Sequence, residues 1–132
     1  MKAFVYQHRV RYADTDQMGV VYHGRYFEWF EAARTEMLRF MGLAYTEVER
    51  SGVMMPVIEA FCRYKIPVTY DENVGIEVTI SELTRAKLRL DYAVIGEENK
   101  LRASGQTLHC FLKDGRPVRI PDTLDKVLRV AK

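Results

Sequence analysis

The sequence has little of what marks membrane, secreted or nucleic-acid-binding proteins. No run in its 132 residues approaches the roughly 20 apolar residues that a spanning helix needs, so we expect no transmembrane segment. The N-terminal stretch "MKAFVYQHRVRYADTD" turns polar after a few residues, which does not fit a signal peptide. With 20 basic and 18 acidic residues, the net charge of +2 gives no argument for a nucleic-acid partner.

Cysteine and low-complexity sequence are also scarce. The two cysteines, Cys62 and Cys110, stand far apart and form no CxxC pair, so neither a zinc site nor a disulfide framework is indicated. Two free thiols are typical of a cytoplasmic protein, which is the location we predict. The chain has no repeat or linker-like segment and is too short for two ordinary domains. We therefore predict one domain spanning residues 1–132.

Most of the chain alternates apolar and polar residues, and a period of two predicts half-buried strands. The clear runs are Phe4–Tyr12, Ile58–Val68, Val74–Ser81 and Lys87–Val94. A less regular run from Leu101 to Leu112 contains Gly105, which predicts a bulge there. Short turn-like segments ("YDEN", "GEENK", "KDGR") separate the later runs. Such short breaks favour antiparallel hairpins over crossover connections.

One long segment instead repeats its apolar residues at the spacing of a helix face: Tyr26, Phe30, Ala33, Met37 and Met41. This spacing predicts a helix from about Tyr22 to Met41, ended by Gly42. Shorter helices are predicted for "AYTEVERSG" and for "PDTLDKVLRVAK", the latter capped by Asp122 or Thr123. A sheet must bury its apolar face, so we predict an α+β fold with an antiparallel sheet wrapped around the long helix. Apolar edges left uncovered predict a homodimer.

The segment "YADTDQMGVVYHGRYFEWFEAAR" places two carboxylates, a glycine turn and a histidine directly before that helix. Asp14 and Asp16 are two positions apart, and His23 follows seven positions after Asp16. A carboxylate can be a nucleophile or a general base, and the first N–H groups of a helix lack internal partners and favour negative charge. The loop either starts the helix or does chemistry on a ligand held at its end. For Asp14 we predict a structural role, through an Asx turn.

The stretch "YADTDQMGVVYHGRYFEWFEAARTEML" resembles the signature of hotdog-fold acyl-CoA thioesterases of the 4-hydroxybenzoyl-CoA thioesterase family, and within it the branch associated with the Tol-Pal system. The pattern is aromatic-x-D-T/C-D-x-x-G-V-V-Y-H-x-x-Y followed by E-x-A-R, and every element is present. A weaker likeness continues through "YKIPVTYDE". The resemblance implies a hotdog fold, a homodimer or homotetramer with active sites at the dimer interface, an acyl-CoA substrate, and no cofactor besides the coenzyme A of that substrate.

The resemblance also implies roles for individual residues. It makes Asp16 the catalytic residue, as nucleophile or general base, and the backbone N–H of His23 the donor to the thioester oxygen; the His23 imidazole would also touch substrate or water. The substrate-binding residues of the loop are expected to be Tyr12, Gly19, Val20, Val21 and Tyr22. For the phosphates of coenzyme A we predict Arg85 and Lys87 in "LTRAKLRLDY", extended by Arg63 and Lys65. Some relatives carry Ser or Thr where Lys87 stands, which leaves the details of phosphate contact open.

Three other interpretations of these residues compete with an acyl-CoA thioesterase. Asp14, Asp16 and His23 are ligand types for a divalent ion, but no EF-hand register or helical histidine pair accompanies them, so we predict no metal. Basic strand faces also suit an acidic acyl carrier protein. A non-catalytic acyl-binding module is disfavoured, because it has no use for a carboxylate in an apolar pocket. Short aliphatic and aromatic acyl groups both remain open, with a pocket expected among Phe27, Trp29, Phe30, Met54 and Met55.

Overall fold

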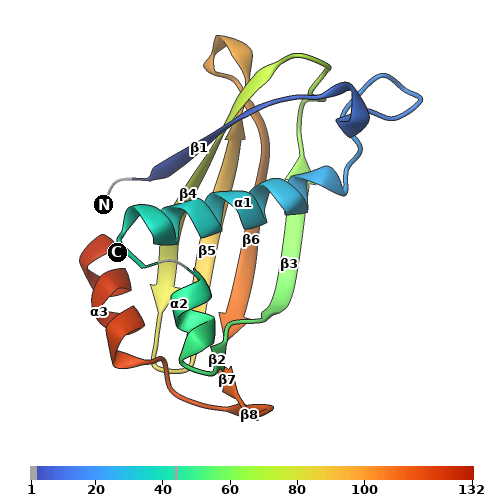
Figure 1. Cartoon of the computed structure of the whole chain (residues 1–132). Coiled ribbons are helices and arrows are strands. Elements are labelled where there is room, and N and C mark those ends of the chain that lie inside the picture. Colours follow the sequence, from blue (N-terminus) through green and yellow to red (C-terminus); the bar gives the residue numbers. More distant parts are fainter. Residues whose placement is uncertain (1–2, 44) are drawn as a thin grey trace.

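The computed structural model describes residues 3–43 and 45–132 and shows an antiparallel sheet curved against one long helix (Figure 1). The helices are α1 (Arg25–Phe40), α2 (Tyr45–Arg50) and α3 (Asp122–Ala131), with short 3-10 helices η1 (Tyr12–Asp14) and η2 (Glu97–Asn99). The strands are β1 (Phe4–Arg9), β2 (Val53–Met54), β3 (Val57–Tyr64), β4 (Asn73–Leu83), β5 (Lys87–Ile95), β6 (Leu101–Cys110), β7 (Leu112–Lys113) and β8 (Arg116–Pro117). The main sheet has the order β1-β4-β5-β6-β3, and the predicted α+β class is confirmed.

Helix α1 lies across one face of this sheet and supplies much of the core (Figure 1). Its buried residues fall on one side, as predicted: Tyr26, Trp29, Phe30, Ala33, Met37 and Leu38. The central strands β4 and β5 turn alternate residues toward them, and the Phe30 ring stacks on Tyr92 with centroids 4.2 Å apart. Each large apolar side chain buried in this way contributes roughly 1.5–3 kcal/mol. The helix is therefore held firmly against the sheet.

The bulge predicted at Gly105 is wrong. Gly105 pairs in register with both Tyr92 and Cys62, and irregular pairing occurs elsewhere, for example between Val57 and Glu59. A Cβ at position 105 would lie 2.5 Å from a ring carbon of Phe30 and 2.7 Å from the carbonyl oxygen of Phe61. Glycine is needed here because α1 approaches β6 too closely for any side chain.

Several predicted boundaries shift by a few residues. Helix α1 begins at Arg25 rather than Tyr22, because residues 22–24 form a turn with Gly24 as the N-cap. Its end is close to the prediction, and Gly42 takes the expected left-handed conformation with φ of 86°. The first strand stops at Arg9, since Tyr12 already belongs to η1. Helix α3 has Pro121 as its N-cap, not Asp122 or Thr123.

The edge strand β3 is the most exposed strand of the main sheet. All of its residues except the half-buried Cys62 are exposed, including Val57, Ile58, Phe61 and Tyr64. Within the described residues β3 pairs on one side only, with β6. An unpaired apolar edge is what a second chain can cover.

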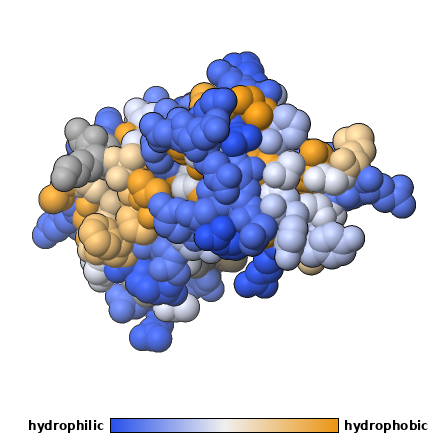
Figure 2. Space-filling view, turned by 90° about the horizontal axis from the view of Figure 1, so that it is seen from above, coloured by the Kyte–Doolittle hydropathy of each residue, from blue (hydrophilic) through white to orange (hydrophobic). Residues whose placement is uncertain are grey.

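The surface is mostly hydrophilic on the face seen in Figure 2, with smaller apolar patches between the hydrophilic residues. Phe40 at the end of α1 is 78% exposed, and its ring contacts Phe4 at a centroid distance of 5.4 Å. None of the helices within the described ranges is both long and apolar enough to cross a membrane.

Candidate active site

The loop between η1 and α1 is closed by backbone hydrogen bonds. The N–H of Asp16 donates to the carbonyl of Val20 at 2.9 Å, and the N–H of Gly19 donates to the carbonyl of Asp16 at 3.0 Å. Gly19 has a φ of 79°, a conformation that glycine adopts without strain. The N–H of Val21 then donates to the carbonyl of Val68 at 2.8 Å. These bonds hold the loop against the segment that leads into β4.

Asp16 forms the Asx turn that was predicted for Asp14. Its Oδ1 accepts a hydrogen bond from the N–H of Met18 at 2.8 Å, two residues further on. The Asx turn predicted for Asp14 is wrong, because the N–H of Arg11 and the imidazole of His8 occupy that carboxylate. Among the residues that the structure describes, Oδ2 of Asp16 has no hydrogen-bond partner. One carboxylate oxygen is therefore fixed by the turn, and the other remains available.

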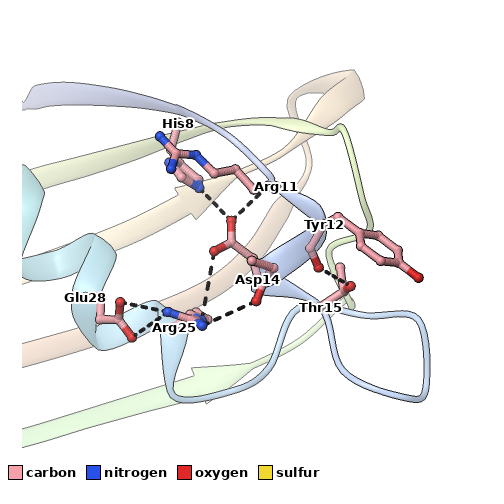
Figure 3. Close-up of polar contacts among 8 residues, drawn as sticks. His8, Arg11, Tyr12, Asp14, Thr15, Arg25 and Glu28 are labelled. Atoms are coloured by element: carbon pink, nitrogen blue, oxygen red, sulfur yellow. Dashed lines mark hydrogen bonds and ion pairs between the residues drawn. The ribbon is translucent and has the colours of Figure 1, made fainter.

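Asp14 points to the opposite side, into the protein (Figure 3). Its Oδ2 accepts hydrogen bonds from the N–H of Arg11 at 2.9 Å and from Nε2 of His8 at 3.0 Å, and Oδ1 lies 3.9 Å from Nε of Arg25. Burial raises the pKa of Asp14, but these hydrogen bonds and the charges of His8 and Arg25 outweigh it, so its pKa lies below the ordinary value.

The main chain around Asp14 ties the loop to the helix. The carbonyl of Asp14 accepts the N–H of Tyr22 at 2.9 Å, and the guanidinium of Arg25 donates to the carbonyl of Ala13 at 3.3 Å (Figure 3). Arg25 also pairs with Glu28 on the next turn of α1. Asp14 thus joins β1, the loop and the start of α1, which fits the structural role predicted for it. His8 in β1 has its hydrogen-bond partner in this carboxylate.

A cavity of about 250 Å³ lies beside the loop. The residues lining it come from the loop, from α1 and from the end of β3: Asp16, Met18, Val20, Val21, His23, Tyr26, Tyr64, Lys65, Ile66 and Pro67. Four residues of the predicted site, Asp16, Val20, Val21 and His23, are brought together here. The lining is mainly apolar with one carboxylate and one ammonium group. Such a cavity can hold an acyl group next to Asp16.

His23, which lines this cavity, and Gly24 directly precede the first residue of α1. Within residues 3–43 and 45–132, neither His23 nor Gly24 donates its N–H to another group of the chain. The carbonyl of Tyr22 accepts the N–H of Arg25 at 2.9 Å, and that of His23 accepts the hydroxyl of Tyr64 at 2.8 Å. Free N–H groups at the positive end of a helix dipole can stabilise a negatively charged oxygen.

Some predicted substrate-binding residues lie outside this cavity. Tyr12 is 79% exposed and packs edge-on against Tyr70, and Tyr22 lies against the ring of His23 without lining the cavity. Gly19 shapes the loop turn. Their part in substrate binding stays a prediction.

The predicted coenzyme A residues lie far from Asp16 within one chain. Arg85 and Lys87 are in the β4–β5 hairpin, at the end of the sheet opposite to the loop (Figure 1). Arg85 lines a separate polar cavity with Arg119 and Asp122. The phosphate-binding role of both residues also stays a prediction.

The aromatic and methionine residues considered for an acyl pocket do not line the cavity. Trp29, Phe30 and Met55 are buried, while Phe27 and Met54 are exposed. Which of them would contact an acyl group depends on the rotation of α1, and that rotation turns Trp29 and Phe30 toward the core.

Two tyrosines of the site were not predicted as site residues. Tyr26 was assigned to the apolar face of α1 and Tyr64 to a strand face, yet both line the cavity with rings 4.9 Å apart. Burial raises the pKa of Tyr26 to about 12 and also raises the pKa of Tyr64, so both hydroxyls stay protonated near neutral pH. The signal that could have found Tyr64 is the stretch "YKIPV", where the motif likeness continues after the strand.

His109 in β6 is fully buried. Its Nε2 accepts the hydroxyl of Thr107 at 2.9 Å, and its Nδ1 lies 3.2 Å from the carbonyl of Met55. Burial and the charge of Arg34 lower the pKa of His109 to about 4. It is a neutral core histidine.

No group of three or more His, Cys, Asp or Glu side chains that could hold a metal occurs in the described part of the chain.

Comparison with known proteins gives a consistent family. Residues 10–128 match the model of the thioesterase-like superfamily. The acyl-CoA thioester hydrolase YbgC of Escherichia coli O157:H7 is 32% identical over 100 residues, covering 76% of this chain and 75% of YbgC. The structure of the DHNA-CoA thioesterase from Staphylococcus aureus is 30% identical, with a TM-score of 0.92 over 98% of this chain and 91% of its own. A hypothetical protein from Thermus thermophilus is 38% identical, with a TM-score of 0.92 over 97% and 98%. The predicted hotdog fold is confirmed.

Proposed function

Because the chain belongs to the thioesterase-like superfamily, we propose that it hydrolyses the thioester of a short-chain or aromatic acyl-CoA with the loop that precedes α1. Acyl-CoA thioester hydrolase is its enzyme class, shared with relatives that match most of the chain. One observation carries the assignment of residues. Asp16 and His23 line the same cavity of about 250 Å³, and within the described part of the chain Oδ2 of Asp16 accepts no hydrogen bond and the N–H of His23 donates none.

Two routes to hydrolysis fit this arrangement. In the first, Oδ2 of Asp16 attacks the thioester carbon, the C–S bond breaks to release coenzyme A as a thiolate, and water hydrolyses the acyl anhydride. In the second, Asp16 takes a proton from a water molecule, whose oxygen attacks the same carbon directly; the C–S bond then breaks, and the released thiolate of coenzyme A can take up the proton from Asp16. Both routes place negative charge on the carbonyl oxygen, and the N–H of His23 is the donor proposed to stabilise it.

The size and lining of the cavity support a small acyl group. Drug-sized ligands occupy pockets of roughly 300–1,000 Å³, and this cavity of about 250 Å³ is at or below that range. Tyr26, Tyr64 and Val21 offer apolar surface to an aliphatic chain or a single ring. The Staphylococcus aureus relative is named for an aromatic acyl-CoA, DHNA-CoA.

We infer that the chain forms a homodimer in which β3 pairs antiparallel with β3 of a second copy. The exposed apolar edge described above supports this pairing. A twofold axis at β3 would bring the β4–β5 hairpin of one chain to the same end of the joined sheet as the loop of its partner. Arg85 and Lys87 would then serve the partner's substrate, which accounts for their distance from Asp16 within one chain. A homotetramer built from such dimers is also compatible with the proposal.

The closer assignment, to the 4-hydroxybenzoyl-CoA thioesterase family and its Tol-Pal-associated branch, is part of the same proposal. It is supported by the D-T-D-x-x-G-V-V-Y-H motif from Asp14 to His23.

A cytoplasmic location is likewise proposed, on the grounds of two half-buried free cysteines.

The test is thiol release from a panel of acyl-CoA substrates of different chain length and ring content, without added metal. Asp16→Asn should lower kcat by about a hundredfold to ten-thousandfold, the range that a positioned acid–base group supplies. Its melting temperature should stay near that of the parent, because Asn keeps the acceptor for the N–H of Met18. A parent protein that releases no thiol from any substrate, or an Asp16→Asn variant of near-parental activity, contradicts the proposal.

A further inference from the structure

Tyr64 makes a contact that links the sheet edge to the start of α1. It is the last residue of β3, and its hydroxyl donates a hydrogen bond of 2.8 Å to the carbonyl of His23, 41 residues earlier in the chain. Its ring packs edge-on against Tyr26 with centroids 4.9 Å apart. Burial, together with the neighbouring Cys62, raises the pKa of Tyr64. The hydroxyl is therefore a donor throughout the neutral pH range.

The strand end that carries Tyr64 is firmly anchored. The N–H groups of Lys65 and Ile66 both donate to the carbonyl of Arg102, at 2.8 and 3.0 Å. The guanidinium of Arg102 forms a buried ion pair with Glu72 at 2.5 Å and donates to the carbonyl of Pro67 at 3.2 Å. Since neighbouring groups are fixed by these bonds, Tyr64 presents its hydroxyl from a constant position.

The group that Tyr64 holds belongs to the peptide unit between His23 and Gly24. In a planar trans peptide the C=O and the N–H point in opposite directions, so fixing the carbonyl of His23 fixes the N–H of Gly24. The other hydrogen bond to this carbonyl, from the N–H of Tyr26, is long at 3.4 Å. The N–H of His23 belongs to the preceding peptide unit, which is joined to the His23–Gly24 unit at the Cα of His23. A hydrogen bond to a carbonyl also polarises the N–H of the same unit.

We propose that Tyr64 is a positioning residue of the thioesterase site, holding the His23 carbonyl so that the free amides of His23 and Gly24 keep a fixed direction. This inference rests on the proposed function. Without the hydroxyl, the His23 carbonyl keeps, among the described residues, the long bond from the N–H of Tyr26. The donors at the helix start then lose their alignment toward the charge that develops on the thioester oxygen.

Tyr64→Phe removes the hydroxyl and keeps the ring that packs on Tyr26. Thiol release should show a kcat about tenfold lower, since loss of one well-placed hydrogen bond is worth about that factor, while KM changes less than about twofold. In nuclear magnetic resonance spectra the amide signal of Gly24 should shift, and amide exchange of Tyr26 should accelerate severalfold. The control is Tyr70→Phe, since Tyr70 is exposed and its hydroxyl has no hydrogen bond among the described residues. It should leave kcat, the Gly24 signal and the Tyr26 exchange unchanged.

The outcomes separate this inference from the function on which it rests. A parent protein without thiol release refutes the proposed function, while the Gly24 signal and Tyr26 exchange still decide whether Tyr64 positions the helix start. A Tyr64→Phe protein with parental kcat, Gly24 signal and Tyr26 exchange overturns the positioning role. A higher KM with unchanged kcat, or a large fall in melting temperature with unchanged kcat, also overturns it, because either would make Tyr64 a binding or purely structural residue.

Discussion

The buried carboxylate of Asp14 allows a quantitative prediction about stability. Asp14→Asn keeps the size of the side chain but removes its charge. The carboxylate accepts hydrogen bonds from Arg11 and His8 and lies near Arg25, and bonds to charged groups contribute roughly 1.5–3 kcal/mol each. Because the amide can still accept from one of these donors, we expect a net loss of about 2 kcal/mol at pH 7. For a domain of this size that lowers the melting temperature by roughly 6–10 °C.

The lowered pKa of Asp14 determines how the stability difference between the parent and Asp14→Asn changes with pH. The pKa of Asp14 is lowered on folding from an ordinary value of 3.8, so the folded state favours the ionised form. The resulting stability is fully present above the unfolded pKa and is lost as the pH falls through the folded pKa. The difference in unfolding free energy between the parent and Asp14→Asn should therefore be fully present at pH 5 and shrink toward pH 3.

Urea unfolding at pH 7, 5 and 3 measures this difference directly. Asp114→Asn is a matched control, because Asp114 is exposed on the β7–β8 turn and has no ion pair among the described residues. That variant should change the unfolding free energy by less than about 0.5 kcal/mol at every pH. Equal stability of Asp14→Asn and the parent at pH 7, or a difference that grows as the pH falls from 5 to 3, would refute the reasoning.

Three further predictions concern the dimer and the core. Phe61→Glu places a charge on the exposed edge of β3, so light scattering should detect monomers and thiol release should fall; an unchanged dimer would exclude β3 as the interface. Inactive Asp16→Asn can be mixed with an Arg85→Ala/Lys87→Ala double variant, and the mixture dissociated and reassociated. Part of the thiol-release activity should return if each site takes residues from both chains. No recovery would place these basic residues outside the site. Gly105→Ala should destabilise the fold by about 2 kcal/mol in urea unfolding, because its methyl group meets Phe30, whereas Ser104→Ala should have little effect. A neutral Gly105→Ala would contradict the close approach of α1.

The sequence was most informative where local pattern decides structure. The alternation along β4 and β5 and the apolar face of α1 predicted those elements, since burial on one side leaves a period of two or of 3.6 residues. The meeting of Asp16 and His23 followed from the resemblance. The Asx turn went to the wrong carboxylate because either aspartate could form it, and only the contact with His8 decides that Asp14 faces inward.

The contributions of distant segments could not be predicted. Periodicity predicted a strand over Ile58–Val68, which the structure has as Val57–Tyr64, but not that this strand pairs with β6 at the sheet edge. That pairing carries Tyr64 and Lys65 to the cavity. Likewise, Gly105 was given a local explanation, whereas its real constraint comes from Phe30 across the core.

The two aspartates, Asp14 and Asp16, have separate roles, and this separation has an evolutionary consequence. Asp14 faces inward and anchors the scaffold, while Asp16, two positions later, faces the cavity. A descendant could replace the residue at position 16 and lose or change its chemistry without disturbing the anchor. Homologues that have lost activity would keep the first aspartate and lose the second. Comparing these two positions across homologous sequences would therefore distinguish proteins that keep only the fold from those that also keep the catalytic carboxylate.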